Sequence, residues 1–442
     1  MQLSDHPFQR TNADNVVNHT YQETVRRLSE RIVEAQRPIR ILDAVKWDDS
    51  VRQSFFAAKC SALPAVDRAY YQGQSLGFDP LEYRRQFQEI GREVVRRLGQ
   101  FNPVGAIMQR MCSEYETVVR MLELRGSPEF SRLSQALYGS AHDVFHAGDP
   151  TLADLGFMMT DTLSNIDDSA YLPDEEHTIT AEQAVRLLQE RLDQVFVDPE
   201  HRVRVILSDG IIADAAAGSN YLKVRQAARF NERDIRLLEV HEGWVHLGTT
   251  LNGLRQPVCT FLSKAPPSAT ITQEGLSILT EILSFASTPR RLRRLTYRIR
   301  AIDMAENGAN FLEVFTFFQE QGLNQLESYH GAVRVFRGST PSDGPFTKDI
   351  SYHKGFILTY NFIVLAVRKG RLELIPLLFC GKTNLEDIRT LGQLVAEGLV
   401  EVPRFLPPPF ADLNGLTAWM CYSNFLSRLS LERIEADYAN LL

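Results

Sequence analysis

The stretch LLEVHEGWVHLG, residues 237–248, decides how this 442-residue chain is interpreted. It places His241, Glu242 and His246 in the order H-E-x-x-x-H, and Glu274 follows in TQEGLSILTE, residues 272–281. Imidazole and carboxylate are both good Zn²⁺ ligands, and three protein ligands leave a fourth position for water. A neighbouring glutamate that binds no metal can take the proton of that water. Together these residues predict a hydrolytic zinc site.

The spacing of the two histidines does not fit one face of a regular α-helix. Side chains four residues apart on an α-helix differ in direction by about 40°, whereas side chains five apart differ by about 140°. His241 and His246 therefore share a metal only if the helix between them is distorted, and a π-bulge is a common distortion at functional sites. Gly243 would ease it, because glycine lacks the Cβ that restricts the backbone. Chance is the alternative for the bare motif, at roughly one chain of this length in a hundred.

The surroundings of the motif favour a site. Asn231 is a candidate N-cap, and apolar residues recur at helical spacing through the motif, which predicts a helix with one buried face. Upstream, RVRVILSDG (202–210) and NYLKVRQAARF (220–230) alternate like two strands, and the segment between them is rich in turn formers. A strand pair that leads into a metal-binding helix is typical of zinc peptidases, whose edge strand holds an extended substrate.

The second metal segment also has a helical pattern. Thr272 is its candidate N-cap, which would place Glu274 in the first turn, close to a cleft. Glu281 shares the same face and is the alternative ligand. Its other interpretation is an ion-pair partner for the basic run PRRLRRLTYRIR, residues 289–300. We prefer Glu274 as the ligand.

Several short motifs of the chain resemble those of a known family. HEGWVH, LNGLRQP, TQEGLS, RVFRG, FTKDISYHKG and PLLFCGK together resemble the flavohaemoglobin-expression-modulating QEGLA-motif proteins, which are similar to the microtubule-associated tyrosine carboxypeptidases. The resemblance covers roughly residues 120–410. It implies a zinc metallopeptidase in which His241, His246 and Glu274 bind Zn²⁺ and Glu242 is the general base. Ser277 replaces the usual alanine, and Trp244 replaces a small residue within the motif, so tyrosine specificity does not transfer directly.

Other residues are candidates for binding the substrate. A carboxypeptidase needs a fixed cation for the terminal carboxylate of its substrate, and Lys348 of FTKDISYHKG is the first candidate. Arg255 and Arg337 compete with it for that role. Tyr352, four residues after Lys348, could stabilise the oxyanion of the reaction. The alternative is that Lys348 is an ordinary surface lysine without a role in binding.

Composition limits the possible partners and the compartment. The net charge is −7 and the pI about 5.9, so no basic field predicts nucleic-acid binding. Five scattered cysteines without CxxC pairs indicate reduced thiols in a cytoplasmic protein. The N-terminus has no signal-peptide pattern. The most apolar stretch, GFILTYNFIVLAV, is too short to cross a bilayer and predicts a buried helix.

The expected organisation has two parts. Residues 1–150 form an N-terminal helical region, residues 151–180 a boundary rich in Asp, Pro and Thr, and residues 181–442 the catalytic domain, whose first helix starts near Thr180. The expected class is α+β with helix predominating, in a zincin-like domain with a small sheet.

The expected function is zinc-dependent removal of C-terminal residues from peptides or proteins. Two alternatives stay open: a metal-binding regulatory protein without peptidase turnover, and a hydrolase of small amides. The sequence leaves the substrate and the oligomeric state undetermined.

Overall fold

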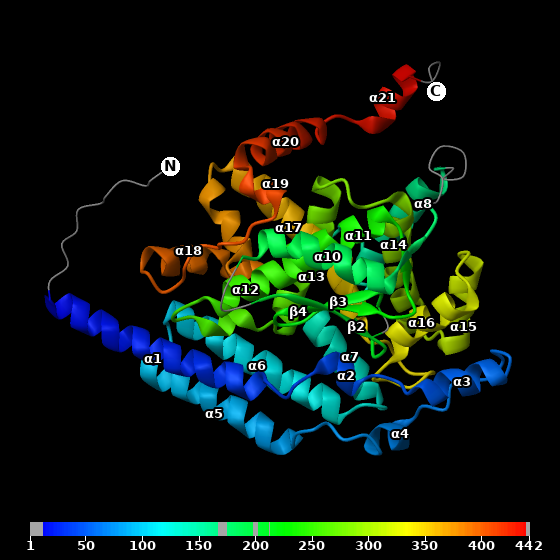
Figure 1. The fold of residues 1–442 in the computed structure, drawn as a ribbon, viewed down its shortest axis with the longest axis horizontal. Coiled ribbons are helices and arrows are strands. Elements are labelled where there is room, and N and C mark those ends of the chain that lie inside the picture. Colours follow the sequence, from blue (N-terminus) through cyan, green and yellow to red (C-terminus); the bar gives the residue numbers. More distant parts are fainter. Residues whose placement is uncertain (1–11, 167–174, 198–201, 212, 439–442) are drawn as a thin grey trace.

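The computed structural model describes residues 12–166, 175–197, 202–211 and 213–438 of the chain. Helices predominate in it, and the strands form only two small sheets (Figure 1). The expected class, α+β with helix predominating, is confirmed.

The N-terminal region is built from helices. They are α1 (Asn12–Gln36), α2 (Ile41–Ala44), α3 (Asp49–Ala57), α4 (Arg68–Gln72), α5 (Pro80–Leu98), α6 (Pro103–Glu123), α7 (Pro128–Tyr138) and α8 (Leu152–Ser164). The long helices α1, α5 and α6 lie side by side along one edge of the molecule (Figure 1). α5 and α6 each begin with proline, whose missing N–H is not needed at the first helical position. Asp79 and Asn102 precede these prolines and cap the free N–H groups of the first turn.

One hydrophobic core joins this region to the rest of the chain. Val25 of α1 and Phe87 of α5 belong to the same buried cluster as Leu276, which follows the second metal segment's glutamate. α8 lies within residues 151–180 and packs against α14 (Pro289–Glu306). The packing is therefore continuous across the segment expected to be a boundary.

The main sheet has three strands, in the order β2–β4–β3. β2 (Arg204–Ser208) and β4 (Tyr221–Arg225) are the two predicted strands, and they pair in parallel. β3 (Ala215–Ala217) pairs antiparallel with β4 and leaves its other side as a sheet edge. The sequence predicts only a turn where β3 lies. That prediction is wrong because alanine has little strand propensity of its own, and β3 forms through its pairing with β4.

Two short strands join the start of the catalytic part to the motif helix. β1 (Ile179–Thr180) pairs with β5 (Arg229–Phe230), so α10 (Ala181–Val195) and α11 (Glu232–Leu238) begin close together. Thr180 is the N-cap of α10, as predicted. The apolar faces of α10, the main sheet and α11 form one core.

The remaining elements surround two central helices. The other α-helices are α12 (Gly248–Leu254), α13 (Pro267–Leu283), α15 (Phe311–Glu320), α16 (Gln325–Phe336), α17 (Ser351–Arg368), α18 (Ile388–Ala396), α19 (Pro408–Ala411), α20 (Leu413–Leu426) and α21 (Leu431–Tyr438). The 3₁₀ turns are η2 (Thr260–Ser263), η3 (Thr347–Ile350), η4 (Leu372–Leu374), η5 (Pro376–Phe379) and η6 (Leu385–Asp387). α13 and α17 touch backbone to backbone, because a Cβ on Gly275 would lie 2.1 Å from the carbonyl carbon of Gly355. In Figure 1, α20 lies across the molecule from α1 and α5.

The apolar stretch predicted to be a buried helix lies in α17. Together with η3 it forms Thr347–Arg368, the one helix in the described part of the chain that is long and apolar enough to span a membrane. Core helices meet the same criterion of length and composition. α17 packs along α13 and holds that helix in place.

Candidate metal centre

One continuous helix, residues 232–254, carries both histidines and consists of α11, a central segment η1 (Glu239–Leu247) and α12. Asn231 is its N-cap, as predicted, and forms a reciprocal capping box with Asp234. The apolar side chains of α11 pack on α10 and the sheet. Because this end of the helix is buried and capped, the motif starts from a fixed position.

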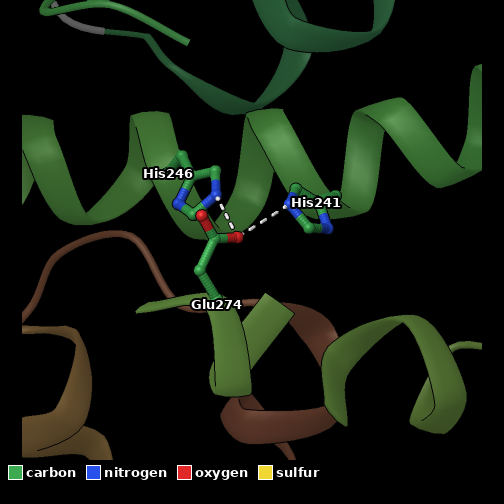
Figure 2. Close-up of side chains that lie close together, drawn as sticks. All are labelled: His241, His246 and Glu274. Carbon is green, nitrogen blue, oxygen red and sulfur yellow. Dashed lines mark ion pairs between the residues drawn. The ribbon is translucent and has the colours of Figure 1, made fainter. Parts of the chain in front are cut away.

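The segment η1 is a π-helix. The N–H of Gly248 donates to the carbonyl of Gly243, five residues back, which is the π-helical pattern. Side chains five apart therefore point the same way, and His241 and His246 project together (Figure 2). The predicted distortion is confirmed. Gly243 also lets α10 approach, since a Cβ there would lie 2.6 Å from Cδ2 of Leu192.

α13 brings the third residue of the group, Glu274. The helix starts at Pro267, so Thr272 is an interior residue and not the N-cap, and Glu274 is buried in the second turn and not in the first. The sequence-based start is wrong because proline at the first helical position begins the helix earlier. The hydroxyl of Thr272 accepts the N–H of Leu385. The contact between Gly275 and α17 holds Glu274 at a fixed depth.

The three side chains form a compact group. Oε2 of Glu274 lies 3.5 Å from Nε2 of His241 and 3.6 Å from Nε2 of His246 (Figure 2). All three ligand atoms lie within 4.8 Å of one another. Oε2 is buried and has no hydrogen-bond partner, although an unpartnered buried carboxylate oxygen is costly. A cation placed between the three atoms would satisfy it, so the group fits a metal ion.

Glu281 holds His241 from the far side. Its Oε1 lies 2.6 Å from Nδ1 of His241, and Arg291 donates to the same carboxylate. Burial opposes ionisation, but Arg291 and His241 lower the pKa of Glu281 to about 2. Glu281 therefore lies outside the group of His241, His246 and Glu274, and its predicted ion pair with the basic run of α14 is confirmed. The carboxylate holds a proton of His241 on Nδ1 and turns Nε2 toward Glu274, the orientation that a metal ligand requires.

Lys348 holds Glu274 in a similar way. Its Nζ donates to Oε1 of Glu274 at 3.1 Å, so Oε2 faces the histidines while Oε1 is occupied. Burial opposes ionisation of Glu274, but Lys348 and the histidines keep its pKa well below the usual range. Lys348 is thus a mostly buried partner of the carboxylate and not an ordinary surface lysine.

Glu242 lies next to the group but outside it. Its Oε1 is 3.9 Å from Nε2 of His241, and its Oε2 accepts the N–H of Ala217 at 2.9 Å. Ala217 belongs to β3, the strand that the sequence did not predict. The edge of the sheet therefore fixes this carboxylate beside the histidines.

The other predicted residues are placed differently. The ring of Tyr352 lies 6.5 Å from that of His241, centre to centre, so Tyr352 borders the group. Arg255 is the C-cap of α12, nine residues beyond His246 and about 13 Å further along the helix. The structure does not bring it to the group. Trp244 packs against Phe196, which is the C-cap of α10.

A cluster of arginines borders Tyr352, and the sequence identified only Arg337 among them. Arg334 donates two hydrogen bonds to Asp349, at 2.7 and 2.9 Å. The guanidinium of Arg298 stacks over the Tyr352 ring at 4.9 Å and lies 3.8 Å from Asp349. Burial and the neighbouring Arg334 lower the pKa of Arg337 to about 10, and its Nε has no partner in the described structure. Around Tyr352, three positively charged guanidinium groups therefore lie near the single negative charge of Asp349.

Lys382, at the end of the motif PLLFCGK, also lies close to the group, which the sequence does not predict. Lys382 is partly buried, and its ammonium group donates to the backbone carbonyl of His246 at 2.8 Å. Burial lowers the pKa of this group to about 7, against the effect of Glu242 and Glu274. Only the fold could reveal this contact, because 136 residues separate the two partners.

A sequence model of the family described as microtubule-associated tyrosine carboxypeptidase matches residues 53–428. The chain belongs to this family. A search of the curated proteins finds no match. The match spans the whole candidate metal centre, so the centre lies in the region that the family shares. Membership indicates a carboxypeptidase, in agreement with the resemblance carried by the motifs.

Proposed function

We propose that this chain is a zinc-dependent carboxypeptidase that removes C-terminal residues from peptides or proteins. The observation that supports it most is that Oε2 of Glu274, which has no well-formed hydrogen bond, lies between the Nε2 atoms of His241 and His246. Glu242 stands beside this group without belonging to it. A purely structural zinc site needs no such base and usually closes with a fourth protein ligand.

The chain's own residues divide the work of hydrolysis. Zinc held by His241, His246 and Glu274 would polarise the scissile carbonyl and acidify a nearby water. Glu242 accepts the proton of the attacking water through Oε1, because its Oε2 is held by Ala217. It then delivers that proton to the leaving amine. The Tyr352 hydroxyl donates to the oxyanion that develops on the carbonyl oxygen.

Arg298 is the residue best suited to bind the substrate's terminal carboxylate. Lys348, the first candidate, already donates to Glu274. Within the described residues, the Arg298 guanidinium makes no hydrogen bond, and the neighbouring Asp349 is taken up by Arg334. Its stacking on Tyr352 fixes it close to the metal group. A guanidinium that is mostly buried and lacks a hydrogen bond is suited to form a bidentate hydrogen bond with a carboxylate.

Hydrolysis of matched peptides tests the proposal. Peptides that end in tyrosine, with a free or an amidated C-terminus, are incubated with zinc-loaded wild type and with Glu242→Gln. Wild type is expected to release tyrosine from the free peptide alone. Glu242→Gln should be at least about 100-fold slower while binding the same amount of zinc.

Two results would contradict the proposal. Full activity of Glu242→Gln at full zinc content would remove Glu242 from the mechanism. Equal cleavage of the free and amidated peptides would show that the terminal carboxylate is not recognised, which would favour an endopeptidase or an amidase.

A further inference from the structure

Lys382 lies on the loop after η5, and this loop is fixed to two elements. The backbone N–H of Lys382 donates to the carbonyl of Leu262 in η2 at 2.6 Å. Three residues on, the N–H of Leu385 donates to the hydroxyl of Thr272 in α13 at 3.1 Å. The base of the lysine side chain is therefore held in place independently of its ammonium group.

The ammonium group uses all of its donors. It donates to the carbonyl of His246 at 2.8 Å, to Oγ1 of Thr249 at 3.1 Å and to Oε1 of Gln273 at 3.1 Å. An ammonium group has three N–H donors, so none is left for a substrate. Thr249 also donates to Gln273, at 2.7 Å. These four residues form one partly buried network that joins the end of η1 and the start of α12 to α13.

Two of the three acceptors of the ammonium group belong to a residue of the metal group or to its direct neighbour. His246 is itself in the metal group, and its carbonyl lies near the end of η1, where the helix returns from π to α geometry. Gln273 directly precedes Glu274. The ammonium group thus joins the backbone of one metal-binding residue to the neighbour of another. The hydroxyl of Thr249 lies near the same two acceptors, at 3.3 and 2.7 Å, but it has a single proton to donate. Among the described residues, Lys382 is the cation that donates to both.

We propose that Lys382 is a positioning residue of the metal centre: it locks the π-helical end of η1 to α13 and thereby sets the separation of His246 and Glu274. Outer-sphere partners of this kind typically change metal affinity by about 10- to 100-fold when removed. The inference rests on the proposed function, because it requires the group to bind a metal.

A purely structural lysine would act differently. It would stabilise the metal-free and the metal-loaded protein equally, because its bonds would contribute to folding alone. A positioning lysine also changes the metal affinity of the folded protein. The rise in Tm on metal binding separates the two roles, since that rise depends on affinity for the native state.

The test measures zinc affinity by competition with a chelator, together with Tm with and without zinc, for the full chain. Lys382→Met is expected to lower zinc affinity by about 10- to 100-fold and to shrink the zinc-induced rise in Tm. The control is Lys264→Met, since Lys264 is a partly buried lysine beside η2. It should leave zinc affinity unchanged. The visible spectrum of the Co²⁺-loaded protein should change for Lys382→Met only, because it reports ligand geometry.

Thr249→Val provides a second, gentler variant if Lys382→Met folds poorly. It removes one acceptor of the network and keeps the shape of the side chain, so a smaller loss of affinity in the same direction is expected. A lower Tm with wild-type zinc affinity and an unchanged Co²⁺ spectrum would overturn the proposal, because it would make the network structural only. If wild type itself bound no zinc, the proposed function would fail first, and this inference with it.

Discussion

Two neighbouring regions of the site balance their charges in opposite ways. The ligand region comprises His241, His246, Glu274 and Glu281 with the partners Lys348 and Arg291. In it each carboxylate has a cation or an imidazole against it. The cation region comprises Arg298, Arg334, Arg337 and Asp349. In it three guanidinium groups lie near one carboxylate, and only Arg298 and Arg334 form ion pairs with it.

The difference indicates what each region is built for. Buried charges are tolerated when they are paired, and the paired ligand region holds its nitrogens and Glu274 Oε2 in position before a metal arrives. The unpaired charge of the cation region costs stability. A cost of this kind at the edge of an active site indicates an anionic ligand, and the terminal carboxylate of a peptide has the required charge and shape.

Removing a partner from the ligand region should have the largest effect. Glu281→Gln leaves Arg291 and His241 without their buried carboxylate, so we expect a loss of about 3–5 kcal/mol in the free energy of unfolding. Zinc affinity should fall by about 10- to 100-fold. Denaturant unfolding and chelator competition measure the two effects.

A matched control for that variant is Glu327→Gln, which breaks the half-exposed pair with Arg294. It should cost at most about 1 kcal/mol and leave zinc affinity unchanged. Equal losses in the two variants would mean that the ligand region is not specially preorganised.

Removing a charge from the cation region should change binding more than stability. Arg298→Met is expected to lower kcat/KM for a C-terminal peptide by about 10- to 100-fold, from the loss of a charged hydrogen bond. The free energy of unfolding should stay level or rise, since surplus positive charge is removed.

Arg300→Met is the control for Arg298, because Arg300 is on the same helix but packs between Phe157 and Phe317. It should leave kcat/KM unchanged. An Arg298→Met variant with wild-type kcat/KM, or with a clear loss of stability, would reassign Arg298 to the fold.

A smaller effect concerns protons in the ligand region. In the metal-free protein burial favours neutral His241, but Glu274 and Glu281 raise its pKa from 6.5 to about 10. A raised folded-state pKa contributes stability that is fully present below about 6.5 and is lost as the pH rises through about 10. Zinc requires the neutral ring, so binding near pH 8 should release about one proton from His241.

Calorimetric titration with zinc in buffers of different ionisation enthalpy counts those protons. The number released at pH 8 should be smaller in Glu281→Gln, whose His241 has lost one of the carboxylates that raise its pKa. The same release in both proteins would show that Glu281 does not control the protonation of His241.

The parts of the site that the sequence could predict have local causes. Two ligands five residues apart on one helix can meet a metal only through a distortion, so the π-helix follows from the spacing of His241 and His246. The cap at Asn231 likewise depends on residues within one turn. The start of α13 also has a local cause, because Pro267 is a stronger helix-start signal than Thr272.

The parts that the sequence could not predict depend on distant contacts. β3 is three alanines, and it exists because β4 pairs with it and the Ala217 N–H binds Glu242. The partner of Lys348 is 74 residues away, and nothing near Lys348 indicates that it binds Glu274 and not a substrate. Arg298 lies in the basic run of residues 289–300, and no residue near it in the sequence indicates that it stacks over Tyr352.

The most direct test of the central claim is anomalous diffraction at the zinc edge from crystals of the zinc-loaded protein. We predict one strong peak about 2.0–2.1 Å from Nε2 of His241 and of His246, and about 2.0–2.2 Å from Oε2 of Glu274, with no fourth protein ligand. Glu242 and Glu281 should remain outside the coordination sphere. A peak on other residues, or a site closed by a fourth protein side chain, would contradict the account.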